Sequence, residues 1–121
     1  MMAVSPTQIK AHHARVRALG CLVHGCLAAT IHHCHSGSLA DAGWTRGWAQ
    51  RGVSEALVIP ICSPIHSVGQ FAIDGGFGVR SWETKFGTQM DFLREVSELL
   101  GYDLFELALK WGYTKDGRHK L

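Results

Sequence analysis

Three histidines within four positions, His32, His33 and His35, are the residues of this chain best suited to chemistry. Imidazole titrates near neutral pH and is the commonest metal ligand in proteins. In an extended strand successive side chains alternate between faces, which predicts His33 and His35 on one face and His32 with Cys34 on the other. Each buried ring nitrogen needs a hydrogen-bond partner, so a purely structural strand gains nothing from such a cluster. The cluster therefore predicts a metal site or an acid–base site.

Two strands and a short helix are expected to position these histidines. Residues 21–34 predict two short strands around a turn at Gly25, of which 28–33 is the stronger. The β-branched run 56–62 predicts the next strand, and the proline inside it indicates a sheet edge or a strand end. A Ser-Pro pair then opens a short helix that carries His66. This order is a ββα arrangement that could hold one divalent ion between strand and helix.

The ordered set resembles a known nuclease family. Thr30-Ile31-His32-His33, followed by Val58-Ile59-Pro60-Ile61-Cys62 and His66, is similar to the HNH (ββα-metal) nucleases. More narrowly it resembles the phage-type Ref family, the RecA-dependent nucleases associated with recombination enhancement. The resemblance covers roughly residues 14–101, with 36–54 least matched. Further pieces that carry it are Ala18-Leu19-Gly20-Cys21, the stretch 75–83, and Ser81-Trp82-Glu83 with Phe86-Gly87-Thr88.

The resemblance implies roles for the matching positions. His33 would be the general base that deprotonates a water for attack on a phosphodiester, a task that suits an imidazole near neutral pH. His32 and His66 would bind one Mg²⁺ or Mn²⁺ ion, whose place Zn²⁺ could take in a crystal. Asp74 is the candidate third ligand, because a hard ion prefers oxygen, and His35 is the alternative. Such an ion stabilises the departing 3′ oxygen and the developing charge.

Two departures from the family pattern affect what can be transferred. The chain contains no asparagine, so the middle residue of the HNH motif, which helps orient the catalytic histidine, is missing. A backbone carbonyl or Glu55 would have to replace it. Relatives also carry a structural zinc between two Cys-x-x-Cys pairs, whereas the second pair here ends at Ile65, which cannot ligate.

Four other side chains could in principle complete a structural zinc site. The alternative is that the cysteines are small buried hydrophobic residues. The four candidate ligands are Cys21, His24, Cys26 and Cys62.

Length and composition indicate one globular domain. The 121 residues are 46% hydrophobic and 18% charged, which is typical of a folded chain and not of a disordered one. The formal charge of +2 neither indicates nor excludes a nucleic-acid partner. We predict a single α+β domain, 1–121, with a small ββα-metal core at about 20–80, an N-terminal helix, and a helical C-terminal part at 81–113.

The helices on either side of the predicted core have clear start signals. Ser5-Pro6-Thr7-Gln8 is a capping box with proline in the first turn, and Gly20 ends that helix. Its charged residues favour a solvated face, with phosphate contact as the alternative. In the last third, 81–86 and the segments after Thr88 and Asp103 predict three helices whose apolar stripes are core.

Residues 36–51, rich in Gly, Ser and Ala, predict a long loop or a loop with one helical turn. Its tryptophans and arginines could stack on and attract a nucleic acid, or the segment could be a lid that packs its tryptophans inward.

The sequence also bears on location. No secretory signal is visible, and no apolar run approaches the roughly 20 residues of a membrane helix. We therefore expect a cytoplasmic protein with no membrane contact and with reduced cysteines. A Cys21–Cys26 disulfide is the alternative in an oxidising compartment.

The leading functional hypothesis is a metal-dependent DNA endonuclease or nickase of HNH type, encoded by a phage or prophage. Its partner would be DNA, with a RecA filament or a second copy of the chain helping to grip it. The alternative is a catalytically silent ββα-metal domain that binds DNA or a protein. A third hypothesis is a histidine-rich metal-binding protein unrelated to nucleases.

Overall fold

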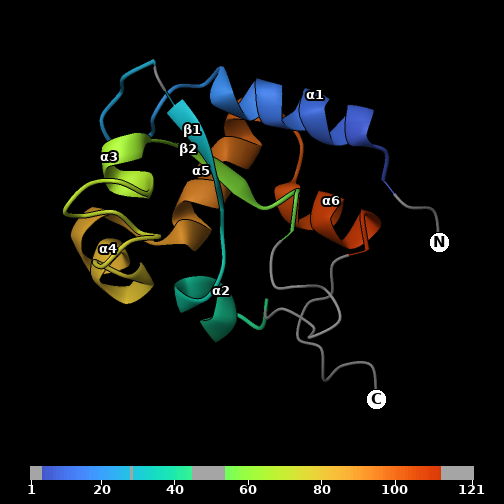
Figure 1. Cartoon of the computed structure of the whole chain (residues 1–121). Coiled ribbons are helices and arrows are strands. Elements are labelled where there is room, and N and C mark those ends of the chain that lie inside the picture. Colours follow the sequence, from blue (N-terminus) through green and yellow to red (C-terminus); the bar gives the residue numbers. More distant parts are fainter. Residues whose placement is uncertain (1–3, 28, 45–53, 113–121) are drawn as a thin grey trace.

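Helices and one antiparallel strand pair form the part of the chain that the computed structural model describes, residues 4–27, 29–44 and 54–112. The predicted α+β class is confirmed. In chain order the elements are α1 (Pro6–Arg17), β1 (Ala29–His33), α2 (Gly37–Asp41), β2 (Val58–Cys62), α3 (Ser63–His66), α4 (Val79–Phe86), α5 (Gln89–Leu100) and α6 (Leu104–Lys110) (Figure 1).

The strand pair brings the histidine motif beside the second apolar run. β1 and β2 are antiparallel, with Ile31 opposite Pro60 and His33 opposite Val58. All five residues of β2 are buried, whereas β1 is mostly half-buried. With only two strands in this sheet each strand is an edge, which is where a proline is tolerated. The strand predicted over 56–62 therefore forms, but it begins at Val58.

The predicted strand before Gly25 does not form. Gly20 and Gly25 both adopt positive φ, and the chain between them folds into a tight turn. The Cys21 N–H donates to the Cys26 carbonyl at 2.8 Å, and the Gly25 N–H donates to the Cys21 carbonyl at 2.8 Å. These bonds close the segment on itself, so its backbone cannot pair along a neighbouring strand.

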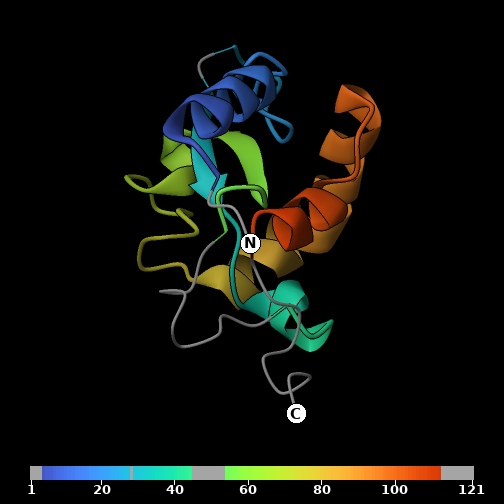
Figure 2. The same ribbon diagram turned by 90° about the vertical axis from the view of Figure 1, so that its right-hand side faces the viewer.

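Helix α1 covers the strand pair. Ser5 caps it and forms a full capping box with Gln8, as the sequence predicts. The helix ends at Arg17, before the predicted stop at Gly20. Its buried residues, His12 and Val16, are the ones turned toward the interior. Figure 2 shows α1 lying over β1 and β2, with α5 and α6 to one side of the strands.

The C-terminal helices complete the core as their apolar stripes predict. Thr88 caps α5 and Asp103 caps α6. The two helices contribute the fully buried residues Leu93, Val96 and Leu104, and α4 contributes Trp82. Among the described residues, no helix has the length and apolarity needed to cross a membrane.

In the described part of the segment 36–51, residues 36–44, there is one short helix, α2, in agreement with the predicted loop with one helical turn. Trp44 is buried, with its ring 5.2 Å from that of Phe105, so this tryptophan packs inward. The nucleic-acid contact or inward packing predicted for Arg46, Trp48 and Arg51 concerns residues outside those that the structure describes.

Candidate metal centre and general base

Three predicted ligands, His32, His66 and Asp74, meet between β1, α3 and the turn that follows α3. Asp74 Oδ2 lies 3.3 Å from His32 Nδ1 and 3.1 Å from His66 Nε2. The three ligand atoms lie within 4.8 Å of one another. His32 is fully buried, whereas Asp74 is 36% exposed, so the cluster opens to solvent on the carboxylate side. Two imidazoles and one carboxylate are a donor set that divalent ions accept.

The tautomer of His66 follows from its neighbours. Thr30 Oγ1 lies 2.7 Å from the Ile61 carbonyl, which can only accept, so the hydroxyl proton is donated there. The same oxygen lies 2.8 Å from His66 Nδ1 and therefore accepts a proton from Nδ1–H. In the neutral ring this leaves Nε2 unprotonated, and Nε2 is the atom that faces Asp74.

A second network fixes the tautomer of His32. Gln89 Nε2 donates to the His35 carbonyl at 2.8 Å, so the other amide atom, Oε1, is an acceptor. Oε1 lies 3.0 Å from His32 Nε2 and also accepts the His35 N–H at 3.2 Å. Neutral His32 therefore carries its proton on Nε2. Its unprotonated Nδ1 faces Asp74.

The electrostatics of the cluster favour a bound cation. Partial burial raises the pKa of the Asp74 carboxyl, but hydrogen bonds and charge from His32, His35 and His66 outweigh it and hold the pKa at about 2. Burial lowers the pKa of His66, as does the charge of His32, while Asp74 raises it. With both rings in their neutral forms, two imidazole lone pairs would point at an ionised carboxylate. A cation, or a proton taken up by one ring, would relieve their repulsion.

His35 lies on the side of His32, not of His33 as strand alternation predicts. Its Nε2 is 3.3 Å from Asp74 Oδ1, and its ring centroid is 5.8 Å from that of His32. The physical reason is that β1 ends at His33, and Ser36 then adopts φ 61° as the chain turns into α2. His35 thus contacts the second oxygen of the candidate ligand.

His33, the candidate base, points to the opposite side of β1 and contacts Glu55. Its Nε2 lies 2.8 Å from Glu55 Oε1. A carboxylate accepts, so His33 donates from Nε2, and the neutral ring has its lone pair on Nδ1. The side chain is 35% exposed, which leaves room for a water. Of the two substitutes expected for the missing asparagine, Glu55 is the one in contact.

His13 of α1 also contacts Glu55 and His33, and it was not predicted as a site residue from the sequence. His13 Nε2 donates to the Glu55 backbone carbonyl at 2.9 Å and lies 3.4 Å from its carboxylate. The rings of His13 and His33 are 5.6 Å apart in an edge-to-face arrangement. The His13 contacts fix Glu55 through both its backbone and its side chain, which in turn fixes the ring of His33.

Glu83 and Gln89 support the cluster and were also missed as site residues. The buried Glu83 carboxylate accepts the Gln89 backbone N–H at 2.8 Å and the Ser38 hydroxyl at 2.6 Å. It thereby holds the first residue of α5 beside β1, where Gln89 orients His32. A Cβ added at Gly37, which has φ +50°, would lie 2.5 Å from Glu83 Oε1, so glycine is needed there.

The predicted zinc ligands also come together, at the turn between α1 and β1. The Sγ atoms of Cys21, Cys26 and Cys62 lie within 4.8 Å of one another. His24 Nδ1 is 3.0 Å from Cys62 Sγ, and the His24 N–H donates to Cys21 Sγ at 3.3 Å. All four cysteines, including the separate buried Cys34, are free thiols.

The two buried thiols of this cluster are shifted in opposite directions. Burial raises the pKa of Cys21, but backbone N–H groups, that of His24 foremost, outweigh it and lower the pKa. Burial and the neighbouring Cys21 raise the pKa of Cys62 to about 11. Of these two buried thiols, Cys21 is therefore the one that more readily supplies a thiolate to a soft metal ion.

Comparisons with protein-family models, curated proteins and solved structures found no match to this chain. The likeness to HNH nucleases therefore remains a resemblance in the motif residues.

Proposed function

We propose that this protein is a metal-dependent DNA endonuclease or nickase of HNH type, with β1, β2 and α3 as its ββα-metal core. One observation carries the proposal. His32 and His33, adjacent on β1, serve two different clusters: His32 presents an unprotonated nitrogen to a carboxylate and a second histidine, and His33 is held by Glu55 with its other nitrogen available. Hydrolysis of a phosphodiester needs both a cation site and a base.

His33 would act as the general base. With Nε2–H donated to Glu55, Nδ1 would take a proton from the attacking water, and Glu55 would stabilise the resulting imidazolium. The partial exposure of His33 lets water and a phosphodiester reach it from solvent. Glu55 would thus perform the orienting task that the absent asparagine performs in the family pattern.

His32, His66 and Asp74 would hold one divalent ion, and the residues present fit it. Thr30 and Gln89 fix the two imidazole tautomers that a ligand needs, which is the usual role of groups behind metal-binding histidines. A bound Mg²⁺ or Mn²⁺ would supply charge stabilisation to the phosphate and the leaving 3′ oxygen. His35 could replace one protein ligand or bind a softer ion such as Zn²⁺.

A second metal, a structural Zn²⁺, would be held by Cys21, Cys26, Cys62 and His24. Three thiolates and one imidazole form a closed tetrahedral zinc site. The grouping of the three thiols and the contact of His24 with Cys62 support this proposal. Such an ion would join the turn after α1 to the end of β2, and thereby fix α3 and His66.

We further propose DNA as the partner and the cytoplasm as the location, with an origin in a phage or prophage. A chain of this size grips little DNA alone, so a RecA filament or a second copy of the chain would add contact. These proposals follow from the resemblance.

The decisive experiment is cleavage of supercoiled plasmid and of single-stranded DNA by the purified protein with Mg²⁺, Mn²⁺ or EDTA. We expect metal-dependent nicking that His33→Ala abolishes while its circular dichroism spectrum and melting temperature stay close to those of wild type. Equal nicking by wild type and a folded His33→Ala would exclude His33 as the base.

The alternative is a silent ββα-metal domain that binds DNA or a protein partner, and the absence of asparagine favours it. Salt-dependent DNA binding without cleavage, with and without a RecA filament, would support this alternative. Tight transition-metal binding with no attachment to DNA would instead indicate a metal-binding protein unrelated to nucleases.

A further inference from the structure

Helix α1 carries positive charge that nothing on the helix balances. Its residues include Lys10, Arg15 and Arg17 and no acidic residue. The formal charge of the whole chain is only +2, so the rest of the molecule is close to neutral. Lys10 and Arg17 are exposed, and neither forms an ion pair among the described residues.

The charges of α1 fall on two different faces. A groove of about 650 Å³ runs along one face, lined among the described residues by Thr7, Lys10, Ala11, His13, Ala14 and Arg17. Arg15 lies on another face, where it lines a separate hollow together with Lys110 of α6. Positions 10, 13, 14 and 17 share one face because an α-helix repeats every 3.6 residues.

His13 connects the first groove to the candidate base. It lines the groove, and its ring is 5.6 Å from that of His33. Both rings contact Glu55. A polymer lying in the groove would therefore pass beside His33, with Lys10 on one side of His13 and Arg17 on the other.

We propose that this α1 groove binds the phosphate backbone of the nucleic acid and guides the strand past His33, with Lys10 and Arg17 contacting phosphates on either side. The proposal rests on the proposed function for the identity of the ligand. Seven residues of helix span about 10 Å. This matches the axial rise of about three nucleotides of one duplex strand, so the two cations can contact separate phosphates.

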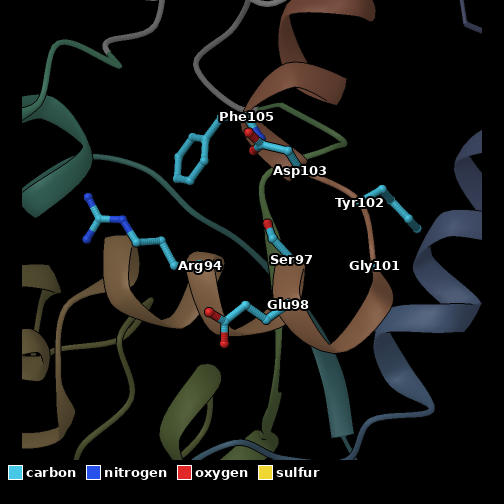
Figure 3. Close-up of a pocket in the computed structure, with 7 residues that line it drawn as sticks. All are labelled: Arg94, Ser97, Glu98, Gly101, Tyr102, Asp103 and Phe105. Atoms are coloured by element: carbon cyan, nitrogen blue, oxygen red, sulfur yellow. The ribbon is translucent and has the colours of Figure 1, made fainter.

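A third hollow lacks the charge needed for a polyanion. It has a volume of about 490 Å³ and lies where α5 meets α6. Figure 3 shows Arg94 and Glu98 from α5 together with Asp103 at the start of α6. Arg94 pairs with Asp91 at 3.1 Å, and the two acidic residues of the lining would repel phosphate.

The test compares two variants with equal loss of charge. Lys10→Gln/Arg17→Gln removes both cations of the α1 groove, and Arg15→Gln/Lys110→Gln removes two from the other hollow. Binding to a fluorescent DNA duplex is measured by anisotropy in EDTA over a salt series. We expect the first variant alone to lose at least about tenfold in affinity, and its salt slope to fall by about two, roughly one for each lost phosphate contact.

Equal losses in the two variants would overturn the inference, because they would show only a general effect of charge. Unchanged affinity in Lys10→Gln/Arg17→Gln, or no DNA binding by wild type, would also overturn it. Melting temperatures close to that of wild type would show that both variants fold. Because anisotropy in EDTA requires no catalysis, absence of metal-dependent nicking would contradict the nuclease while leaving the difference between the variants as evidence for the groove.

Discussion

His66 Nε2 faces Asp74 Oδ2 at 3.1 Å, while the other nitrogen of the same ring is hydrogen bonded to Thr30. Because the Thr30 hydroxyl proton is already donated to the Ile61 carbonyl, a neutral His66 ring has no proton between its Nε2 and the ionised Asp74 carboxylate. Thr30 therefore determines which nitrogen of His66 is unprotonated and faces Asp74.

Replacing Thr30 with Val should weaken metal binding by about tenfold to a hundredfold, the usual cost of losing a group that orients a ligand histidine. Valine keeps the shape but cannot accept the proton of His66 Nδ1. Thr30→Ser is the matched control, since it retains the hydroxyl. Mn²⁺ affinity is measured by calorimetry, and equal affinities for the Val and Ser variants would contradict the role of Thr30.

The Cys21–Cys26–Cys62 cluster gives a second prediction. We expect wild type to bind Co²⁺ with the charge-transfer absorption of thiolate ligands, and Zn²⁺ removal by a chelator to lower the melting temperature. Cys62→Ala should lose the absorption, whereas Cys34→Ala, which removes a buried thiol outside the cluster, should keep it. An unchanged Co²⁺ spectrum in Cys62→Ala would exclude Cys62 as a ligand.

The contact of Glu55 with His33 gives a third prediction, which concerns the candidate general base. Glu55→Ala removes the acceptor of His33 Nε2–H, so the ring should populate both tautomers and rotate more freely. We expect kcat to fall by about tenfold to a hundredfold, a part of the 10²–10⁴-fold that a positioned base contributes, with KM little changed. Glu55→Gln retains an acceptor oxygen and should lose less.

Nitrogen NMR of the imidazoles checks this prediction independently of activity. Wild-type His33 should show its proton on Nε2, and Glu55→Ala a mixture of tautomers. If the spectrum of His33 is the same in both proteins, Glu55 does not fix the ring.

The local elements were predictable because their signals are local. The capping box at Ser5 and Gln8 and the caps at Thr88 and Asp103 need only neighbouring residues, and all three mark helix starts in the structure. The position of His35 was predicted wrongly, because alternation holds only while the chain stays extended. The prediction carried alternation past the expected strand 28–33, whereas β1 ends at His33 and the chain turns at Ser36.

The supporting residues were not predictable from local patterns. Gln89 orients His32 across a separation of 57 residues, and His13 reaches Glu55 across 42. A glutamine at a helix start and a histidine on a basic helix have ordinary local explanations. Only the packing of α5 and α1 against the strands gives them partners. Sequence reasoning could therefore name the candidate ligands but not the groups that orient them.

His12 gives a prediction about stability and pH. This buried ring contacts the Ala56 carbonyl through Nε2 at 3.1 Å and the Tyr102 hydroxyl through Nδ1 at 2.8 Å. The carbonyl can only accept, so Nε2 carries the proton and Nδ1 accepts from Tyr102. Burial outweighs the Ala56 hydrogen bond and lowers the pKa of His12 below its ordinary 6.5.

The lowered pKa of His12 makes the free energy of unfolding depend on pH. Below about pH 6.5 the unfolded chain protonates His12 while the folded chain does not. The unfolded state then binds more protons, so the free energy of unfolding falls as pH falls, until the lowered pKa of the folded state is reached. The slope is at most about 1.4 kcal/mol per pH unit for this one group.

Replacing His12 with Gln should remove this contribution, because glutamine can still donate to the Ala56 carbonyl but does not titrate. We expect wild type to lose stability more steeply than His12→Gln between pH 6.5 and 5 in urea unfolding. His66, whose pKa is also lowered, is present in both proteins and cancels in the difference. Parallel pH profiles for the two proteins would mean that His12 is not held neutral in the folded state.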